Sequence, residues 1–252
     1  MKKLVVIITI LILFIPKVNA STSSASSYIL MDSTTGRVLM SKDMHSKRLI
    51  ASITKIMTAT LAIESGKLND VVEVSPIIKK AYGSGIYIEV GEEITLKDLV
   101  YGLMLRSGND AAMMISEYIG GTTEEFVNMM NKKAKELGMK ETTFYNPSGL
   151  PTPSGNYSSA YDMALLTKYA MNSPVYQEIV KTKTYKVTTN KKTYLWHNKN
   201  KLLKYDYITG GKTGYTEESG RTLVSTANID NMSLIVVTIR DSDDWNTHIE
   251  LY

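Results

Sequence analysis

The segment Ala51-Ser52-Ile53-Thr54-Lys55-Ile56-Met57 combines a candidate nucleophile with a candidate base. A serine hydroxyl is a poor nucleophile until a neighbouring group takes its proton. Positions i and i+3 of a helix share a face, so in a helix Lys55 would lie beside Ser52. Apolar residues recur at helical spacing and predict a helix over residues 52–65. They are Ile53, Ile56, Met57 and Leu61, with Thr60 standing where an aliphatic residue would be expected.

Ser52 stands at the start of this predicted helix, where serine is favoured as a cap. The first-turn N–H groups have no partner within the helix, so they could face an oxyanion, and the helix dipole would help. The alternative is that neither residue is catalytic, so that Ser52 only caps the helix and Lys55 is solvated. Since S-x-x-K is a short motif, it favours that interpretation when it is taken alone.

A second motif, Lys212-Thr213-Gly214, precedes a strand-like run at residues 221–227. A glycine in a strand often marks a place where a ligand or another backbone approaches closely. A lysine and a threonine hydroxyl beside such a gap could bind an anionic group. An isolated K-T-G, however, is more typical of a turn with a surface lysine.

A third motif, Ser107-Gly108-Asn109, lies between two runs with helical spacing, at residues 95–105 and from Asp110 onward. The same S-x-N pattern recurs at Ser154-Gly155-Asn156, among prolines, glycine and serines that are typical of a polar loop. We select Ser107 because two helices would hold it rigidly, as a catalytic group requires.

The order S-x-x-K, S-x-N, K-T-G is that of penicillin-binding proteins and class A β-lactamases. From about Ser27 to its last residue, the chain resembles a serine-type D-alanyl-D-alanine carboxypeptidase, a low-molecular-mass penicillin-binding protein of the peptidase S11 kind. The resemblance extends beyond the three motifs. Residues 28–39 resemble the opening hairpin of that family, residues 52–59 its nucleophile segment, and residues 143–150 the loop after its helical region.

The resemblance implies acyl transfer through a covalent serine ester. Ser52 would attack the carbonyl of a D-Ala-D-Ala peptide bond, and Lys55 would accept its proton. For this Lys55 must be neutral part of the time, and burial and the nearby positive Lys212 would both lower its pKa. Ser107, with Lys212, would relay the proton to the leaving amine. Water would then hydrolyse the ester.

The resemblance also implies a substrate-binding set. Asn109 would orient the amide of the substrate, and Thr213 would bind its terminal carboxylate, with charge from Lys212. Gly214 would leave room beside the strand, and the backbone N–H groups of Ser52 and Tyr215 would form the oxyanion hole. The expected partners are peptidoglycan pentapeptide stems ending in D-Ala-D-Ala, with β-lactams as covalent inhibitors.

Two alternatives remain open. A class A β-lactamase would need an E-x-x-L-N segment, which does not occur between Asn109 and Lys212, so we expect slow release of a bound β-lactam. A penicillin-acylated sensor or peptidoglycan-binding module would bind without turnover. Release of D-alanine from a pentapeptide distinguishes a carboxypeptidase from such a module.

The order of patterns predicts an α/β (α+β) fold in which an antiparallel sheet has a helical lobe inserted between its first and later strands. We predict strands at 28–32, 37–41, 184–188, 192–196, 208–213, 221–228 and 232–240, and further helices at 95–105, 109–120, 123–137, 160–172 and from Asp243 onward. The resemblance implies the same architecture, a penicillin-recognising serine transpeptidase/β-lactamase-like fold. Its site would lie between the sheet edge and the helical lobe.

The first 20 residues have the basic start, short apolar run and small-residue end of a signal peptide, although an uncleaved anchor is an alternative. Residues 21–27 would be a flexible polar lead and residues 28–252 the catalytic domain. Compared with the family, we expect an incomplete C-terminal helix and no C-terminal β-domain. The expected location is the outer face of the cytoplasmic membrane or the cell wall of a Gram-positive bacterium.

Composition excludes several classes of function. The chain has no cysteine, and its three histidines are scattered, so we expect neither a thiol nucleophile nor a metal site or other cofactor. Without the predicted signal peptide its 29 basic residues become 26, against 25 acidic ones, which gives no reason to expect nucleic acid as a partner. We interpret the lysines at 191–192 and 199–204 as a solvated face. No membrane segment is expected after signal cleavage.

Overall fold

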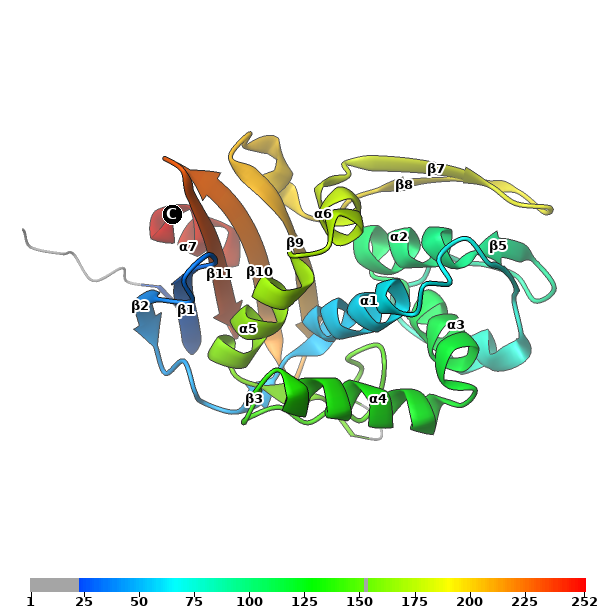
Figure 1. The fold of residues 1–252 in the computed structure, drawn as a ribbon, viewed down its shortest axis with the longest axis horizontal. Coiled ribbons are helices and arrows are strands. Elements are labelled where there is room, and N and C mark those ends of the chain that lie inside the picture. Colours follow the sequence, from blue (N-terminus) through cyan, green and yellow to red (C-terminus); the bar gives the residue numbers. More distant parts are fainter. Residues whose placement is uncertain (1–22, 152–153) are drawn as a thin grey trace, which may run out of the picture.

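Five antiparallel strands from the two ends of the chain form the central sheet (Figure 1). The computed structural model describes residues 23–151 and 154–252. The strand order is β2-β1-β11-β10-β9, so the N-terminal hairpin joins the C-terminal strands through β1 and β11. These strands are β1 (Ser27–Asp32), β2 (Val38–Lys42), β9 (Ile208–Thr216), β10 (Gly220–Ile229) and β11 (Met232–Ile239).

Both faces of this sheet are covered by helices. Successive side chains of a strand point to opposite faces. In β1, Ile29 and Met31 face the main core, whereas Tyr28 and Leu30 pack in a second cluster with Leu251 of the last helix. Figure 1 shows α5 (Ala160–Ala170) and α6 (Pro174–Lys181) on one side of the sheet and α7 (Asp244–Leu251) on the other. Coverage on both sides explains the nearly continuous apolar runs of β1 and β11.

The remaining helices form a lobe beside the sheet (Figure 1). Several helices, α2 and α4 among them, start after a threonine or serine whose hydroxyl accepts a hydrogen bond from a first-turn N–H group, which satisfies an otherwise unpaired donor. The lobe contains α1 (Lys55–Glu64), α2 (Leu96–Arg106), α3 (Asn109–Gly120) and α4 (Thr123–Glu136), and the short helices are η1 (Ala51–Thr54), η2 (Pro76–Lys80) and η3 (Lys201–Lys204). The two-stranded pairs are β3 (Arg48–Leu49) with β6 (Tyr157–Ser158), β4 (Val71–Glu73) with β5 (Glu93–Thr95), and β7 (Thr184–Thr188) with β8 (Thr193–His197).

The predicted fold class is confirmed, because the five-stranded antiparallel sheet has a helical lobe between its first and later strands. The strands β7 and β8, however, pair only with each other and do not join this sheet. The predicted strands and the later helices are present, with ends shifted by a few residues. The exception is the nucleophile helix, which begins as the 3-10 helix η1 and becomes α-helical only at Lys55. Helix α6 was not predicted, since it has only eight residues and begins at Pro174.

The structure also corrects the end of the predicted polar lead. Ser27 already pairs in β1, Ala25 is fully buried, and the N–H of Ser26 donates to the carbonyl of Ile239. The predicted signal peptide and the start of the lead lie outside the described residues. Within the described ranges, none of the helices has the length and apolar character needed to cross a membrane.

Candidate active site

Ser52 lies in η1, the 3-10 turn that leads into α1. The prediction that Ser52 caps the helix is wrong, because Ile50 occupies the cap position and no side chain caps this turn. Ala51, just before Ser52, adopts φ = 48°, a left-handed conformation that is uncommon outside glycine. The hydroxyl of Ser52 is therefore not engaged by the helix start, and it accepts a hydrogen bond from Lys55 instead, with an Nζ–Oγ distance of 3.2 Å.

Lys55 is the first residue of α1 and is completely buried. Besides Ser52, its Nζ donates to Oδ1 of Asn109 at 2.7 Å and to the carbonyl of Ser148 at 2.5 Å. Burial lowers the pKa of Lys55 to about 7, and the charge of Lys199 adds to this effect, while Asp110 opposes it. A lysine with a pKa near neutrality is present partly as the free amine, which is the form that can accept a proton.

A second serine–lysine pair faces the same region. Ser107 ends α2 in a left-handed conformation, with φ = 63° and ψ = 35°, and is 5% exposed. Lys212 of β9 donates to Oγ of Ser107 at 2.9 Å and to the carbonyl of Thr213 at 2.7 Å. Burial, followed by the charges of Lys55 and Lys199, lowers the pKa of Lys212. Strained backbone in a rigid junction is typical of functional sites.

Gly214 brings the edge strand β9 against the turn that carries Ser52. A Cβ atom at position 214 would lie 2.4 Å from Oγ1 of Thr222, 2.9 Å from the backbone N of Ser52 and 3.1 Å from that of Ile53. The same Thr222 donates its hydroxyl to the carbonyl of Ile50 at 3.0 Å. The glycine of K-T-G is thus required by a close approach of two backbones, as the strand pattern predicted.

These residues surround one cavity of about 360 Å³. Five of the eight predicted site residues line it, and they are Ser52, Ser107, Thr213, Gly214 and Tyr215. The other three, Lys55, Asn109 and Lys212, are buried beside it and bonded to one another or to the lining serines. The structure therefore brings together all the residues that the three motifs singled out.

Asn109 differs from the sequence prediction in what it contacts. Its Oδ1 accepts from Lys55, and its Nδ2 donates to the carbonyl of Tyr82 at 2.6 Å. Since both ends of the amide are engaged and the residue is 3% exposed, Asn109 holds Lys55 in place in this structure. The second S-x-N copy is not in the cavity lining. Asn156 bonds instead to Thr54 at 3.0 Å and to the loop before it.

The cavity is also lined by five residues that the motifs did not indicate. They are Ser84, Lys199, Arg221, Asp244 and Trp245. Lys199 donates to Oγ of Ser84 at 3.1 Å, and its charge contributes to the lowered pKa of both Lys55 and Lys212. Lys199 is exposed, in keeping with the predicted solvated face, but that interpretation missed that it also lines the cavity. Arg221 is held by Asp244, with 2.5 Å between Nη2 and Oδ1, and lies over the ring of Trp245.

The loop at residues 145–150 packs against η1, the turn that holds Ser52, and against the start of α1. Its Ser148 carbonyl accepts from Lys55, and its Pro147 carbonyl accepts from Thr58 at 2.6 Å. Gly149 has φ = 86°, and a Cβ there would lie 1.9 Å from the carbonyl oxygen of Ala51. No side chain fits between the loop and the turn, so position 149 requires glycine.

We expect Gly149→Ala to lower both the stability of the protein and its acylation rate. The left-handed backbone costs an alanine about 1–2 kcal/mol, and overpacking adds about 1–3 kcal/mol. Gly138→Ala is the matched control, because Gly138 has φ = 73° but nothing within 4 Å of its Cβ position. Thermal unfolding should show the larger loss for Gly149→Ala. Equal losses would mean that the close contact with the Ala51 carbonyl adds nothing to the cost of the left-handed backbone.

The fold is that of penicillin-binding proteins and DD-peptidases. The model of the D-alanyl-D-alanine carboxypeptidase family, peptidase S11, matches residues 16–243, and the chain belongs to that family. The chain is 44% identical over 224 residues to D-alanyl-D-alanine carboxypeptidase DacF of Bacillus subtilis, covering 84% of this chain and 56% of that protein. It is 35% identical over 243 residues to DacC of Escherichia coli, covering 90% of this chain and 59% of that protein. The chain thus spans a little over half the length of these curated relatives.

Solved structures have the same fold. A D-alanyl-D-alanine carboxypeptidase from Mycobacterium tuberculosis superimposes with a TM-score of 0.83 at 30% identity, covering 86% of this chain and 83% of that one. A Streptomyces K15 DD-transpeptidase superimposes with a TM-score of 0.85 at 29% identity, covering 91% of this chain and 98% of that one.

Proposed function

We propose that this chain is a serine D-alanyl-D-alanine carboxypeptidase that removes the terminal D-alanine from peptidoglycan stem pentapeptides and is inhibited by β-lactams. The observation that carries the proposal is the Ser52–Lys55 pair, with 3.2 Å between Oγ and Nζ and a lysine pKa lowered to about 7. Membership of the peptidase S11 family supports the same conclusion.

The proposed reaction begins when Lys55, as the free amine, takes the proton of Ser52. Oγ of Ser52 attacks the carbonyl carbon of the D-Ala-D-Ala bond, and the backbone N–H groups of Ser52 and Tyr215 stabilise the oxyanion. Collapse of the tetrahedral intermediate breaks the C–N bond. The leaving amine receives a proton through Ser107, which is hydrogen-bonded to Lys212. Water then hydrolyses the ester and restores the hydroxyl of Ser52.

Substrate binding uses charge at the edge of β9. The terminal carboxylate of the substrate would accept hydrogen bonds from the hydroxyl of Thr213 and would be attracted by Lys212 and Lys199. Charge-assisted bonds of this kind are stronger than neutral ones. In this proposal Asn109 acts mainly by positioning Lys55, since both ends of its amide are already engaged. A signal peptide in residues 1–20 and action at the outer face of the cytoplasmic membrane, or in the cell wall, complete the proposal.

Mass spectrometry of the purified protein with a pentapeptide ending in D-Ala-D-Ala, and separately with benzylpenicillin, tests the proposal. We expect release of one D-alanine per peptide and a slowly released penicilloyl adduct on Ser52. An adduct without D-alanine release would indicate a binding module. Rapid turnover of a chromogenic cephalosporin would indicate a β-lactamase.

Transfer to an amine is a second candidate function, because a DD-transpeptidase superimposes over 98% of its own length. An acyl-enzyme can be attacked by water or by an amine, so the two activities share the first step. Adding glycylglycine to the pentapeptide reaction distinguishes them. A ligated product would favour transpeptidation, whereas tetrapeptide alone would favour hydrolysis.

We expect acylation by benzylpenicillin to become faster as pH rises through about 7. Lys55 must lose its proton to act as the base, and its pKa is lowered to about 7. Well below that value, the rate should increase about tenfold per pH unit and then level off. Because Lys55 and Lys212 interact, the inflection reports the pair. Stopped-flow acylation at fixed ionic strength from pH 5 to 9 measures this. A flat profile between pH 5 and 7 would contradict the role of Lys55.

A further inference from the structure

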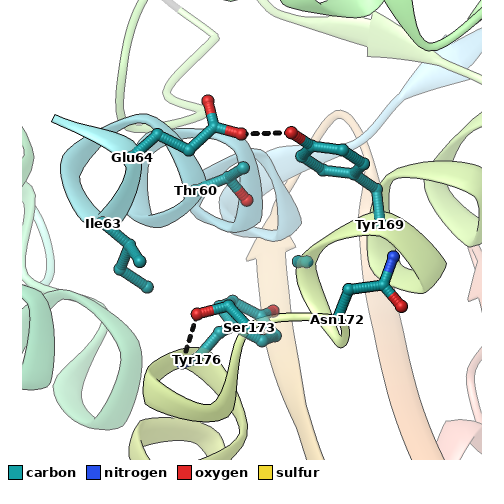
Figure 2. A pocket seen from close by; sticks show the side chains of 8 residues that line it. Thr60, Ile63, Glu64, Tyr169, Asn172, Ser173 and Tyr176 are labelled. Carbon is teal, nitrogen blue, oxygen red and sulfur yellow. Dashed lines mark hydrogen bonds between the residues drawn. The ribbon is translucent and has the colours of Figure 1, made fainter. Parts of the chain in front are cut away.

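A second cavity, of about 290 Å³, lies between the C-terminal half of α1 and the junction of α5 with α6 (Figure 2). None of its lining residues also lines the cavity at Ser52. Thr60 of α1 is five residues beyond Lys55, roughly 7.5 Å further along the helix. The residues that matter here are Thr60, Ile63 and Glu64 from α1, and Tyr169, Ala170 and Tyr176 from α5 and α6.

The body of this cavity suits an apolar molecule. Ile63, Ala170 and the rings of two tyrosines contribute most of its wall. An apolar cavity of about 150 Å³ is large enough to bind benzene, so this one can hold a substituted benzene ring. Its polar positions on α1 are Thr60 and Glu64, and the hydroxyl of Thr60 already donates to the carbonyl of Ile56 at 2.7 Å. A hydroxyl so engaged offers no further donor to a ligand.

Tyr176 supplies a free donor at this cavity. The residue is 2% exposed and lines the cavity from α6. Across residues 23–151 and 154–252, no group forms a hydrogen bond with its hydroxyl. Burial alone raises the pKa of Tyr176, so the hydroxyl keeps its proton. The hydroxyl is not one of the fully buried, unpartnered side-chain atoms of the described residues, which are Asn200 Nδ2 and Asp241 Oδ2. It therefore keeps accessible surface, and because Tyr176 lines the cavity, it can donate a hydrogen bond to a molecule bound there.

The carboxylate of Glu64 disfavours a negatively charged ligand in this cavity. Figure 2 shows the hydroxyl of Tyr169 directed at the carboxylate of Glu64, to which it donates a hydrogen bond. Nζ of Lys133 lies 3.0 Å from Oε2 of the same carboxylate. Both partners therefore hold the Glu64 carboxylate at the cavity. An anionic ligand would meet this carboxylate, so the site favours a neutral one.

We propose that this cavity is a second binding site, which takes a small neutral molecule with an apolar body and one oxygen that accepts a hydrogen bond from Tyr176. This assignment accounts for the unpartnered hydroxyl and for the shape and polarity of the walls. It does not depend on the activity of Ser52, because the two cavities are separate.

Three probes of similar shape test the chemistry: acetophenone, isopropylbenzene and benzoate. Each is titrated into the full chain, and binding is followed from the NMR signal of the Ile63 methyl group. Acetophenone should bind, isopropylbenzene should bind roughly threefold to tenfold more weakly because it lacks the acceptor, and benzoate should not bind. Acylation of Ser52 by benzylpenicillin should leave acetophenone binding unchanged. Competition by benzylpenicillin would instead assign the probe to the active site and overturn the proposal.

Two variants locate the probe. Tyr176→Phe should weaken acetophenone roughly threefold to tenfold and leave isopropylbenzene unchanged. The thermal stability of the free variant should stay close to that of the original chain, because the hydroxyl makes no hydrogen bond within the described residues. Ala170→Leu should fill the cavity and abolish binding of both probes. Undiminished acetophenone binding in either variant, or none in the original chain, would overturn the proposal.

Discussion

Ser52→Ala should abolish both the release of D-alanine and the formation of a penicilloyl adduct. The variant removes the only atom that forms the covalent ester in the proposed mechanism, and loss of a serine nucleophile reduces kcat on the order of 10⁶-fold in a comparable hydrolase. Stability should change little, since the side chain is partly exposed and makes one hydrogen bond, to Lys55. Intact-protein mass spectrometry after incubation with benzylpenicillin measures the adduct directly.

Ser154→Ala is the matched control for this experiment. Ser154 belongs to the second S-x-N copy, is exposed and is not in the lining of the cavity at Ser52. Acylation and D-alanine release should remain at the original rates. A stable adduct that forms on Ser52→Ala at an unchanged rate would place the nucleophile on another residue and would remove the basis of the proposed function.

The residue types of the site could be predicted because each motif is local. S-x-x-K, S-x-N and K-T-G each place their groups within one turn or one strand, and the flanking periodicity shows which element that is. The junction at Ser107 and the close approach at Gly214 followed from the same local patterns. Both are present in the structure, with a left-handed Ser107 and no room for a Cβ at position 214.

The contacts made across the fold could not be predicted in the same way. Lys199 lies in the loop between β8 and η3, where its N–H donates to the carbonyl of Leu105 at 3.1 Å, and Arg221 lies on β10, which pairs with β9. A run of lysines in the sequence gives no sign of these contacts. Likewise, the left-handed Ala51 that frees Ser52 from capping depends on the loop at residues 145–150, whose Gly149 contacts the Ala51 carbonyl. Local propensity favours a serine cap, and tertiary packing overrides it here.

The site also concentrates three cations around one cavity. Lys55 and Lys212 are buried and Lys199 lines the cavity. The charge of Lys199 lowers the pKa of both buried lysines, and the charge of Lys55 also lowers the pKa of Lys212. The structure has no buried carboxylate paired with either buried lysine among its described salt bridges. This arrangement lowers lysine pKa values and leaves a positive field for an anionic substrate terminus. The same group of charges therefore increases the fraction of free amine and attracts an anionic substrate terminus.

Lys55→Met should reduce acylation about 10²- to 10⁴-fold, the usual contribution of a general base. The unbranched methionine side chain fits the space but accepts no proton. Lys55→Arg distinguishes two roles, because an arginine keeps the positive charge and cannot be deprotonated. If Lys55 acts as a base, both variants lose activity. If it acts only through its charge, Lys55→Arg should retain acylation within about tenfold, and the proposed mechanism would be wrong.

A comparison of the original chain with Lys55→Met also tests the lowered pKa of Lys55 without any substrate. The pKa of Lys55 in the folded chain, about 7, lies below the ordinary lysine value of 10.5, so the unfolded chain binds more protons between these two pH values. The contribution of Lys55 to stability is therefore fully present above the unfolded pKa and is lost as pH falls towards 7. The free energy of unfolding of the original chain, relative to Lys55→Met, should rise from pH 7 to 10. A constant difference over that range would mean that Lys55 stays protonated in the folded protein, and it could not then serve as the base for Ser52.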